Sequence, residues 1–409
     1  MNVHRMAARS SWRALAAAAL VAFSASAHAQ FSGNVVRIGI LNDQSGMYAY
    51  MGGSGSVAAA RMAVEDMGGS INGTPVEVIA ADHQNKADVG SVIARRWFDE
   101  QGVDAVADVP VSSVALAVQE IARKANRVAL MMGTTSDLTG KACAPYSTQW
   151  ADDTYSLATA TAKAVVAQGG KTWFFVTADY AFGHAMERDA TAVIKASGGT
   201  VVGSVRHPLN TTDLSSFLLQ AQASKAQVVA LANAGTDLIN ALKQAAEFGL
   251  VSGGQKAVGI LMFATDVDSL GLAATQNALL AEGFYWDQSE SSRAFSKRFM
   301  AKTGKMPTKE HAAVYASVAH YLKAVRQAGS DDAAAVSRAM HATPVDYFGR
   351  AGSIRPDGRV IYPLSLYRVK TPAESKYAWD YYAEVQRVEG KDAFRPEGEG
   401  GCPLTAKPQ

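Results

Sequence analysis

The feature that most constrains this fold is a regular alternation of short apolar runs with amphipathic stretches. In the middle of the chain, apolar runs begin near residues 171, 200, 228, 256 and 280, at intervals of 29, 28, 28 and 24 residues. This spacing is typical of repeated β-α units, each with one strand and one helix. The runs 173–176 and 228–231 contain no polar residue, as expected for parallel strands that are covered on both faces.

An earlier series has the same pattern. Its predicted strands are 35–41, 76–81, 105–109 and 128–132, and the stretches between them carry apolar residues three or four positions apart. Two such series predict an α/β protein with two doubly wound parallel-sheet lobes. After residue 286 we expect helices, a strand pair and an irregular tail held only by Cys402. These segments are helices 289–303, 308–328 and 332–341, strands 346–354 and 362–370, and the tail from Gly390.

The first 29 residues have the three parts of a secretory signal. Arg5, Arg9 and Arg13 precede an apolar run at 14–23, and small residues flank His28 at a cleavage site. The run is shorter than the ~20 residues that span a bilayer, and the alternative is a buried N-terminal helix. We expect export with cleavage before Gln30, which leaves 409 − 29 = 380 residues in the mature chain.

Export bears on the two cysteines, Cys143 and Cys402, because an oxidising compartment permits disulfides. We predict that they pair and tie the C-terminal tail to a loop; the alternative is two free, buried thiols.

Several function classes lack support in this sequence. Lys and Arg total 39 against 37 Asp and Glu, so there is no basic excess for nucleic-acid binding. Residues 53–58 imitate a dinucleotide-binding glycine motif, but Gly53 comes twelve residues after Leu41 rather than in a tight turn. The histidines show no metal-ligand spacing, and no G-x-S-x-G motif is present. We therefore predict no metal, no cofactor and no enzymatic activity.

Polar residues follow several predicted strands, where doubly wound sheets bind ligands. Ser112 and Ser113 follow one strand, and Thr134 and Ser136 follow the next. Hydroxyl and backbone N–H donors without fixed charge suit a carboxylate, although hydroxyls at helix starts are also ordinary N-caps. Five aromatic residues are candidates for the walls of an apolar pocket or for core packing: Tyr48, Tyr50, Trp150, Tyr180 and Phe182.

These strand-end segments resemble the periplasmic leucine/isoleucine/valine-binding proteins, the type I solute-binding proteins of ABC importers. The resemblance covers nearly all of the mature chain and is carried by segments 36–40, 45–46, 69–73, 76–82, 110–113, 133–136 and 179–183. It implies two lobes joined by a three-strand hinge, closure on a small ligand, and delivery to an ABC permease in the inner membrane by a monomer. The implied lobes are 30–151 with 282–361 and 152–281 with 362–388, followed by the tail 389–409.

The resemblance also assigns residues to a ligand. Ser113 (or Ser112) and Thr134, with Ser136 nearby, would hold its carboxylate, and Asp266, after a predicted strand at 261–264, would meet an ammonium. Phe182 stands where amino-acid binders tend to carry Tyr, and Asn233 opens a segment that lacks an expected Tyr. These departures favour an apolar or aromatic carboxylate; branched-chain amino acids and amides stay open. A ligand sensor for a membrane receptor and a secreted hydrolase are the other functions considered.

Overall fold

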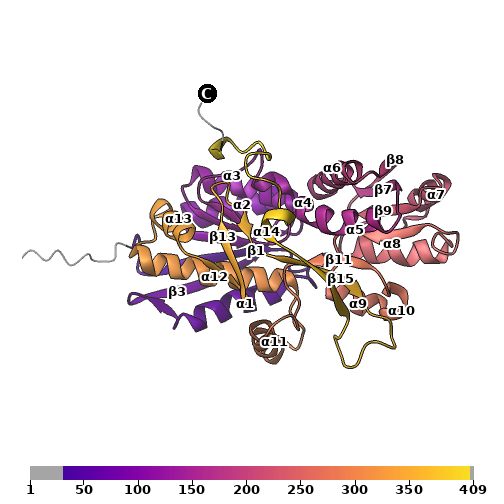
Figure 1. The fold of residues 1–409 in the computed structure, drawn as a ribbon. Helices are drawn as coiled ribbons and strands as arrows, with labels where there is room; N and C mark the ends of the chain where they lie inside the picture. Colours follow the sequence, from indigo (N-terminus) through magenta and orange to yellow (C-terminus); the bar gives the residue numbers. More distant parts are fainter. Residues whose placement is uncertain (1–30, 406–409) are drawn as a thin grey trace, which may run out of the picture.

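The computed structural model describes residues 31–405 as two α/β lobes that lie side by side (Figure 1). Each lobe is built around a largely parallel sheet, which confirms the predicted fold class. The predicted secretory signal lies outside the described residues. No helix within residues 31–405 combines the length and apolar character that crossing a membrane requires.

The first lobe contains a six-stranded sheet in the order β2-β3-β1-β4-β5-β6. The central strand β1 pairs in parallel with β3 on one side and β4 on the other, so the strand order reverses there. Helices α2 and α3 pack together, and α1 packs on a later helix, α12. The bounds are β1 Val36–Asn42, α1 Gly53–Asp66, β2 Ser70–Ile71, β3 Thr74–Asp82, α2 Ala87–Asp99, β4 Ala105–Asp108, α3 Ser112–Lys124, β5 Val128–Met131 and β6 Ser147–Gln149.

The second lobe contains a four-stranded parallel sheet in the order β10-β9-β7-β8, which reverses at β7. Its strands begin within one residue of the predicted positions. The predicted strand at 261–264 is wrong, because β10 ends at Gly259 and α9 begins at Ala264. The bounds are α4 Thr154–Leu157, a π-helical turn Ala158–Ala162, α5 Lys163–Ala167, β7 Thr172–Ala178, α6 Ala181–Ala196, β8 Thr200–His207, α7 Ser215–Ala223, β9 Val228–Ala232, α8 Thr236–Glu247, β10 Lys256–Gly259, α9 Ala264–Leu270 and α10 Leu272–Thr275.

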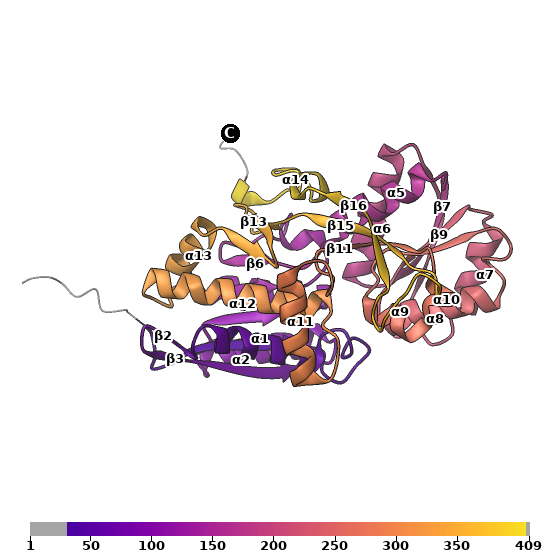
Figure 2. The same cartoon turned by 60° about the horizontal axis from the view of Figure 1, so that its bottom comes forward.

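A small antiparallel sheet of β11, β15 and β16 lies where the two lobes meet (Figure 2). The predicted pairing of 346–354 with 362–370 is wrong. The first run contains β12 and β13, which pair with each other, whereas β15 pairs with β11 and β16. The bounds are β11 Leu279–Glu282, α11 Glu290–Thr303, α12 Lys309–Ala328, α13 Ala333–Ala342, β12 Val345–Tyr347, β13 Arg350–Ile354, β14 Val360–Ile361, β15 Leu364–Val369, β16 Tyr382–Val388 and α14 Gly390–Ala393.

The N-terminus of α12 is fixed against the loop that precedes α1. Thr308 caps α12 and donates from its hydroxyl to the carbonyl oxygen of Met51, 2.6 Å away. Nδ1 of His311 accepts from the backbone N–H of Thr308, so Nε2 carries the hydrogen that it donates to the carbonyl oxygen of Gly52, 2.9 Å away. These bonds place the first turn of a helix from late in the chain beside the end of β1.

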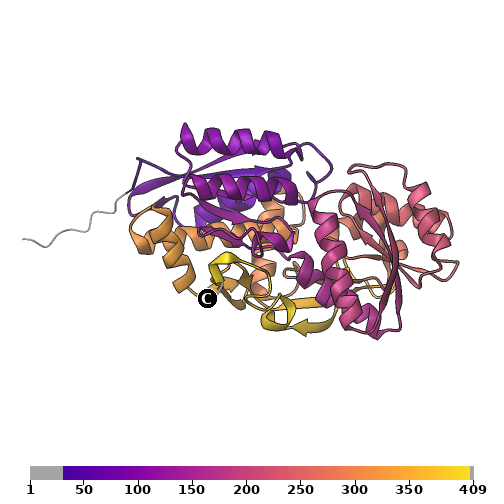
Figure 3. The same cartoon turned by 90° about the horizontal axis from the view of Figure 1, so that it is seen from above.

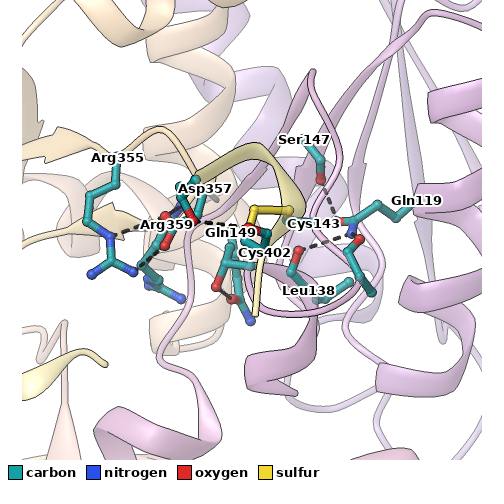
Figure 4. The surroundings of a disulfide bond; sticks show 12 residues. Gln119, Leu138, Cys143, Ser147, Gln149, Arg355, Asp357, Arg359 and Cys402 are labelled. Carbon is teal, nitrogen blue, oxygen red and sulfur yellow. Dashed lines mark hydrogen bonds and ion pairs between the residues drawn. A yellow bond between two sulfur atoms is a disulfide. The ribbon is translucent and has the colours of Figure 1, made fainter. Parts of the chain in front are cut away.

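The predicted disulfide between Cys143 and Cys402 is confirmed, and it ties the C-terminal tail to the loop that follows β5 (Figure 4). The prediction that only Cys402 holds the tail is wrong. Arg355 donates to the carbonyl oxygen of Arg395 at 2.6 Å. The guanidinium of Arg395 in turn lies 3.1 Å from a carboxylate oxygen of Asp189 in the second lobe.

Candidate ligand-binding site

A small cavity lies between the lobes, at the carboxyl ends of both sheets. Its volume is about 40 Å³, room for roughly three water molecules. The lobe-1 side follows β1, β4 and β5, and the lobe-2 side follows β7, β9 and β10; the sheet order reverses at β1/β4 and at β7/β9, where doubly wound sheets bind ligands. Its lining residues are Tyr48, Met51, Gly52, Pro110, Ser112, Thr134, Tyr180, Phe182, Ala234, Leu261, Phe263 and Glu310.

A larger hollow of about 420 Å³ lies on the first lobe alone, among residues of α1, α11 and α12. Movement of one lobe against the other would not open or close it. We therefore assign the candidate site to the cavity between the lobes, where both sheets contribute.

The structure places five of the predicted site residues in the cavity lining: Tyr48, Ser112, Thr134, Tyr180 and Phe182. Of the two neighbouring serines, it is Ser112 that lines the cavity. Its Oγ accepts a hydrogen bond from the backbone N–H of Thr135, at 3.1 Å. Because that bond uses a lone pair, the hydroxyl hydrogen of Ser112 is free to be donated to a ligand.

Two tyrosines of the loop after β1 reach across to the second lobe. The hydroxyl oxygens of Tyr48 and Tyr180 are 2.8 Å apart, and the hydroxyl of Tyr50 donates to the carboxylate of Asp266. Burial raises the pKa of Asp266 to about 6, and the bond from Tyr50 opposes this shift. Phe263 also donates its backbone N–H to Asp266, at 2.9 Å. The described conformation is therefore closed, with both tyrosines bridging the cleft.

The other predicted site residues do not line this cavity. Trp150 is buried in the core of the first lobe, where its ring lies against His320. Ser136 donates to Asp189 at 2.6 Å, in a separate polar cluster near the tail. Asn233 contacts His207 within the second lobe. The remaining members of this group are Ser113, Tyr50 and Asp266.

Glu310 is the most consequential lining residue that the sequence reasoning missed. It lies in the first turn of α12, about 200 residues after Ser112, and is 5% exposed. No local pattern links the two positions, because only the packing of α12 against α1 brings them together. The other lining residues that were missed are Met51, Gly52, Pro110, Ala234, Leu261 and Phe263. The rule that doubly wound sheets bind ligands at the carboxyl ends of their strands predicts the segments that contain these residues, but it does not identify the individual residues.

The backbone at the end of β4 is strained beside the site. Asp108 and Val109 have φ values of +76° and +53°, a region that side chains, and β-branched ones above all, rarely occupy. Such a conformation costs about 1–3 kcal/mol per residue and persists only where the surroundings enforce it. Strain of this kind clusters at functional sites, and here it directs the chain from β4 into Pro110 and Ser112.

Six helices begin at the cavity. Gly52, Tyr180 and Phe263 directly precede α1, α6 and α9, Ser112 and Glu310 lie in the first turns of α3 and α12, and Ala234 lies just before α8. Backbone N–H groups in a first turn have no intrahelical partner, and the helix dipole makes that end partly positive. Since no Lys or Arg is among the lining residues, this arrangement favours a small anion without supplying a fixed cation.

One buried ammonium group lies behind the lining. Lys309 is within 3.4 Å of a carboxylate oxygen of Asp152 and 3.7 Å of one of Glu282, and it lies over the ring of Phe263. Burial lowers the pKa of Lys309, but attraction to the two carboxylates outweighs burial and the pKa rises. Lys309 is thus already paired. In residues 31–405, no cluster of three or more His, Cys, Asp or Glu side chains is arranged to hold a metal ion.

Two hinged α/β lobes with a cavity at the strand ends of both define a class of protein that closes on a small ligand. A family model described as periplasmic binding protein matches residues 35–376, so the chain belongs to that family of solute-binding proteins.

The chain is also similar to particular members of the class. A periplasmic binding protein from Burkholderia mallei is 46% identical, with a TM-score of 0.89 over 91% of this chain and 99% of that one. A branched-chain amino acid ABC transporter periplasmic ligand-binding protein from Burkholderia xenovorans is 41% identical, with a TM-score of 0.81 over 91% of this chain and 100% of that one. A Leu/Ile/Val-binding protein homologue from Brucella melitensis is 28% identical over 65% of this chain and 67% of its own. The family model and these relatives agree that this chain is a solute-binding protein of the periplasmic class.

Proposed function

We propose that this protein captures a small apolar or aromatic carboxylate between its lobes and delivers it unaltered to an ABC permease. The observation that carries the proposal is the set of helix N-termini around a cavity without a lining cation. Ser112 and Thr134 add hydroxyl donors, and Tyr180, Phe182 and Phe263 add aromatic surface. A carboxylate held by N–H and O–H donors needs no buried cation, because charge-assisted hydrogen bonds replace its hydration.

Ligand entry requires the lobes to separate. The closed cavity of about 40 Å³ is far smaller than the ~300–1,000 Å³ of typical small-molecule sites. Opening breaks the bridges of Tyr48 to Tyr180 and of Tyr50 to Asp266. Because the ligand contacts both lobes only when they are closed, it shifts the population towards a closed state that is expanded enough to hold it.

A branched-chain amino acid is the second candidate ligand. The description of the 41% identical relative from Burkholderia xenovorans favours it. Its ammonium group would need an acidic partner, since an unpaired buried charge is costly. Asp266, the predicted partner, already accepts hydrogen bonds from Tyr50 and from the backbone of Phe263. An amino acid would therefore have to displace Tyr50 from Asp266 or place its ammonium beside Glu310, which lines the cavity.

The proposal includes the setting of the protein. The signal at 1–29 directs export, and the mature chain acts in the periplasm as a monomer. Its lobes are 30–151 with 282–361 and 152–281 with 362–388, with a tail at 389–409. The antiparallel sheet of β11, β15 and β16 lies where the two lobes meet, and this position supports a hinge at these boundaries.

A thermal-shift screen of residues 30–409 tests the proposed ligand class. The panel contains benzoates, cinnamates, branched-chain and aromatic amino acids, and short amides. We expect benzoates or cinnamates to raise the melting temperature, because a ligand at a hundred times its Kd stabilises the fold by about 2.7 kcal/mol. A shift from leucine without one from any benzoate or cinnamate would establish the amino-acid alternative instead.

A further inference from the structure

Glu310 and Asp108 form a buried carboxyl pair at the lobe-1 side of the cavity. Glu310 lines the cavity together with Ser112 and Thr134, and Asp108 is the last residue of β4, with no exposed surface. The two carboxyl groups lie close enough to share a hydrogen bond. Two carboxylates cannot share a hydrogen bond without a proton, so the pair holds at least one.

Few other donors reach this pair. Asn42 donates from Nδ2 to Oδ2 of Asp108 at 2.9 Å. The hydroxyl of Ser56 is also close enough to donate to Asp108. Apart from the proton shared with Asp108, no donor among residues 31–405 reaches Oε1 of Glu310. An oxygen of a buried acid that lines a cavity and lacks a donor is a position where a ligand or a proton is needed.

The charged groups around the pair do not supply that donor. Lys309, on the same helix, is engaged by Asp152 and by Glu282 of β11. The charge of Asp152 also acts on Glu310, and the charge of Glu310 in turn acts on the phenol of Tyr347 in β12. His311 points to Gly52, and burial lowers its pKa to about 4, so it is neutral.

Burial raises the pKa of Asp108 to about 7, and it raises that of Glu310 well above the ordinary range, with repulsion from Asp108 adding to it. One proton is therefore held by the pair at neutral pH, and the pair carries a single negative charge. A ligand carboxylate entering beside that charge would be repelled unless a proton came with it.

We propose that Glu310 contacts the ligand and donates a hydrogen bond from its protonated carboxyl group to the ligand carboxylate, beside the hydroxyls of Ser112 and Thr134. This inference rests on the proposed function. In the free protein, the proton of Glu310 is donated to Asp108. When Glu310 turns to the ligand, Asp108 loses its donor and takes one proton from water. Carboxylate binding thus consumes up to one proton, and no covalent bond other than O–H forms or breaks.

The sign of the pH effect follows from this balance. Uptake of a proton favours binding at low pH, where the pair is fully protonated. As the pH rises from about 7 to 9, we expect the affinity for a carboxylate to fall by up to about tenfold per pH unit. The pKa of a benzoate lies far below this window, so the ligand itself does not titrate there.

Calorimetry with benzoate and with cinnamate tests the inference. Titrations of residues 30–409 at pH 8 in phosphate and in Tris give the number of protons bound, because the two buffers release different heats on ionisation. We expect an uptake of about 0.5 to 1 proton per ligand. Glu310→Gln replaces the O–H donor with an N–H donor, so its affinity for the acid should be weaker at pH 6, while Asp108 should still take up a proton on binding. Asp108→Asn removes the group that takes up the proton, so its affinity should be nearly constant from pH 6 to 9, and Asn tolerates the positive φ of that position.

Asp104→Asn is the matched control. Asp104 lies just before β4, so it is at the opposite end of the strand that Asp108 ends. Burial raises its pKa to about 6, yet it bonds to Arg37 and Arg127 and does not line the cavity. This variant should keep the full proton uptake.

Different results separate the two proposals. If neither acid binds, the proposed function fails and the inference fails with it. If an acid binds without proton uptake, or if Asp108→Asn keeps the pH profile, the inference alone is wrong. Proton release on binding would also overturn the inference, because it would show that the carboxyl pair loses its proton and accepts a hydrogen bond from a cationic group of the ligand.

Discussion

At the scale of single residues, Ser112 and Ser113 show what a sequence pattern resolves and what it leaves open. The hydroxyl cluster after β4 is predictable from the strand-end rule. The choice between the two serines is not, because successive residues of a helix point about 100° apart and the direction depends on where α3 begins. The helix begins at Ser112, and this residue lines the cavity, whereas Ser113 does not.

Replacement of Ser112 by Ala therefore has a specific expected result. It removes a donor to the ligand carboxylate, and a hydrogen bond to a charged group contributes about 1.5–3 kcal/mol. We expect at least a tenfold higher Kd by calorimetry with the acid that gives the largest thermal shift. Ser113→Ala makes the same chemical change one residue away and should alter Kd less than twofold. Equal losses in the two variants would contradict the placement of Ser112.

At the scale of elements, most of the fold could be predicted because strand spacing is encoded locally. The strands of the second lobe start within one residue of prediction, since apolar runs bounded by turn residues mark them. Long-range placement could not be predicted in this way. The pairing of β15 with β11 and the approach of α12 to the end of β1 depend on contacts between distant segments. Glu310 lies at the site only because α12 approaches the end of β1.

The turn between β9 and α8 gives a test of lobe closure. Gly235 has φ +66°, and a Cβ there would lie 2.8 Å from the ring of Tyr48 in the opposite lobe. We expect Gly235→Ala to hinder closure and to weaken ligand binding. Gly271 is also in the second lobe, has φ +79°, and would place a Cβ with nothing within 4 Å.

The Gly271→Ala variant thus carries a similar backbone penalty, about 1 kcal/mol or more, without the clash against Tyr48. Calorimetry with the same ligand should give a higher Kd for Gly235→Ala than for Gly271→Ala. Small-angle scattering should show a larger radius of gyration for the ligand-saturated Gly235→Ala variant. Matching affinities for both variants would mean that Tyr48 does not close onto Gly235.

At the scale of the whole molecule, the C-terminal tail connects parts that are far apart in sequence. The disulfide joins positions separated by 259 residues, and Figure 3 shows the tail running over the region near both lobes. Arg395 of the tail donates to Ser136 of the first lobe at 2.7 Å and to Asp189 of the second at 3.1 Å. Ser136, predicted as a ligand contact, therefore belongs to a polar cluster that joins the lobes in the closed conformation.

Removal of the disulfide should lower the free energy of unfolding, because the unfolded chain gains conformational entropy when the cross-link is absent. We expect Cys143→Ser/Cys402→Ser to lose about 2–5 kcal/mol, measured as a lower urea midpoint of unfolding. Arg395→Ala keeps the disulfide and removes only the bonds from Arg395 to Ser136 and Asp189, so its urea midpoint should change much less. Because those bonds add to the contact between the two lobes, Arg395→Ala should mainly raise the Kd of the ligand. A large stability loss in Arg395→Ala with an unchanged Kd would show that the tail supports the fold of one lobe and takes no part in closure.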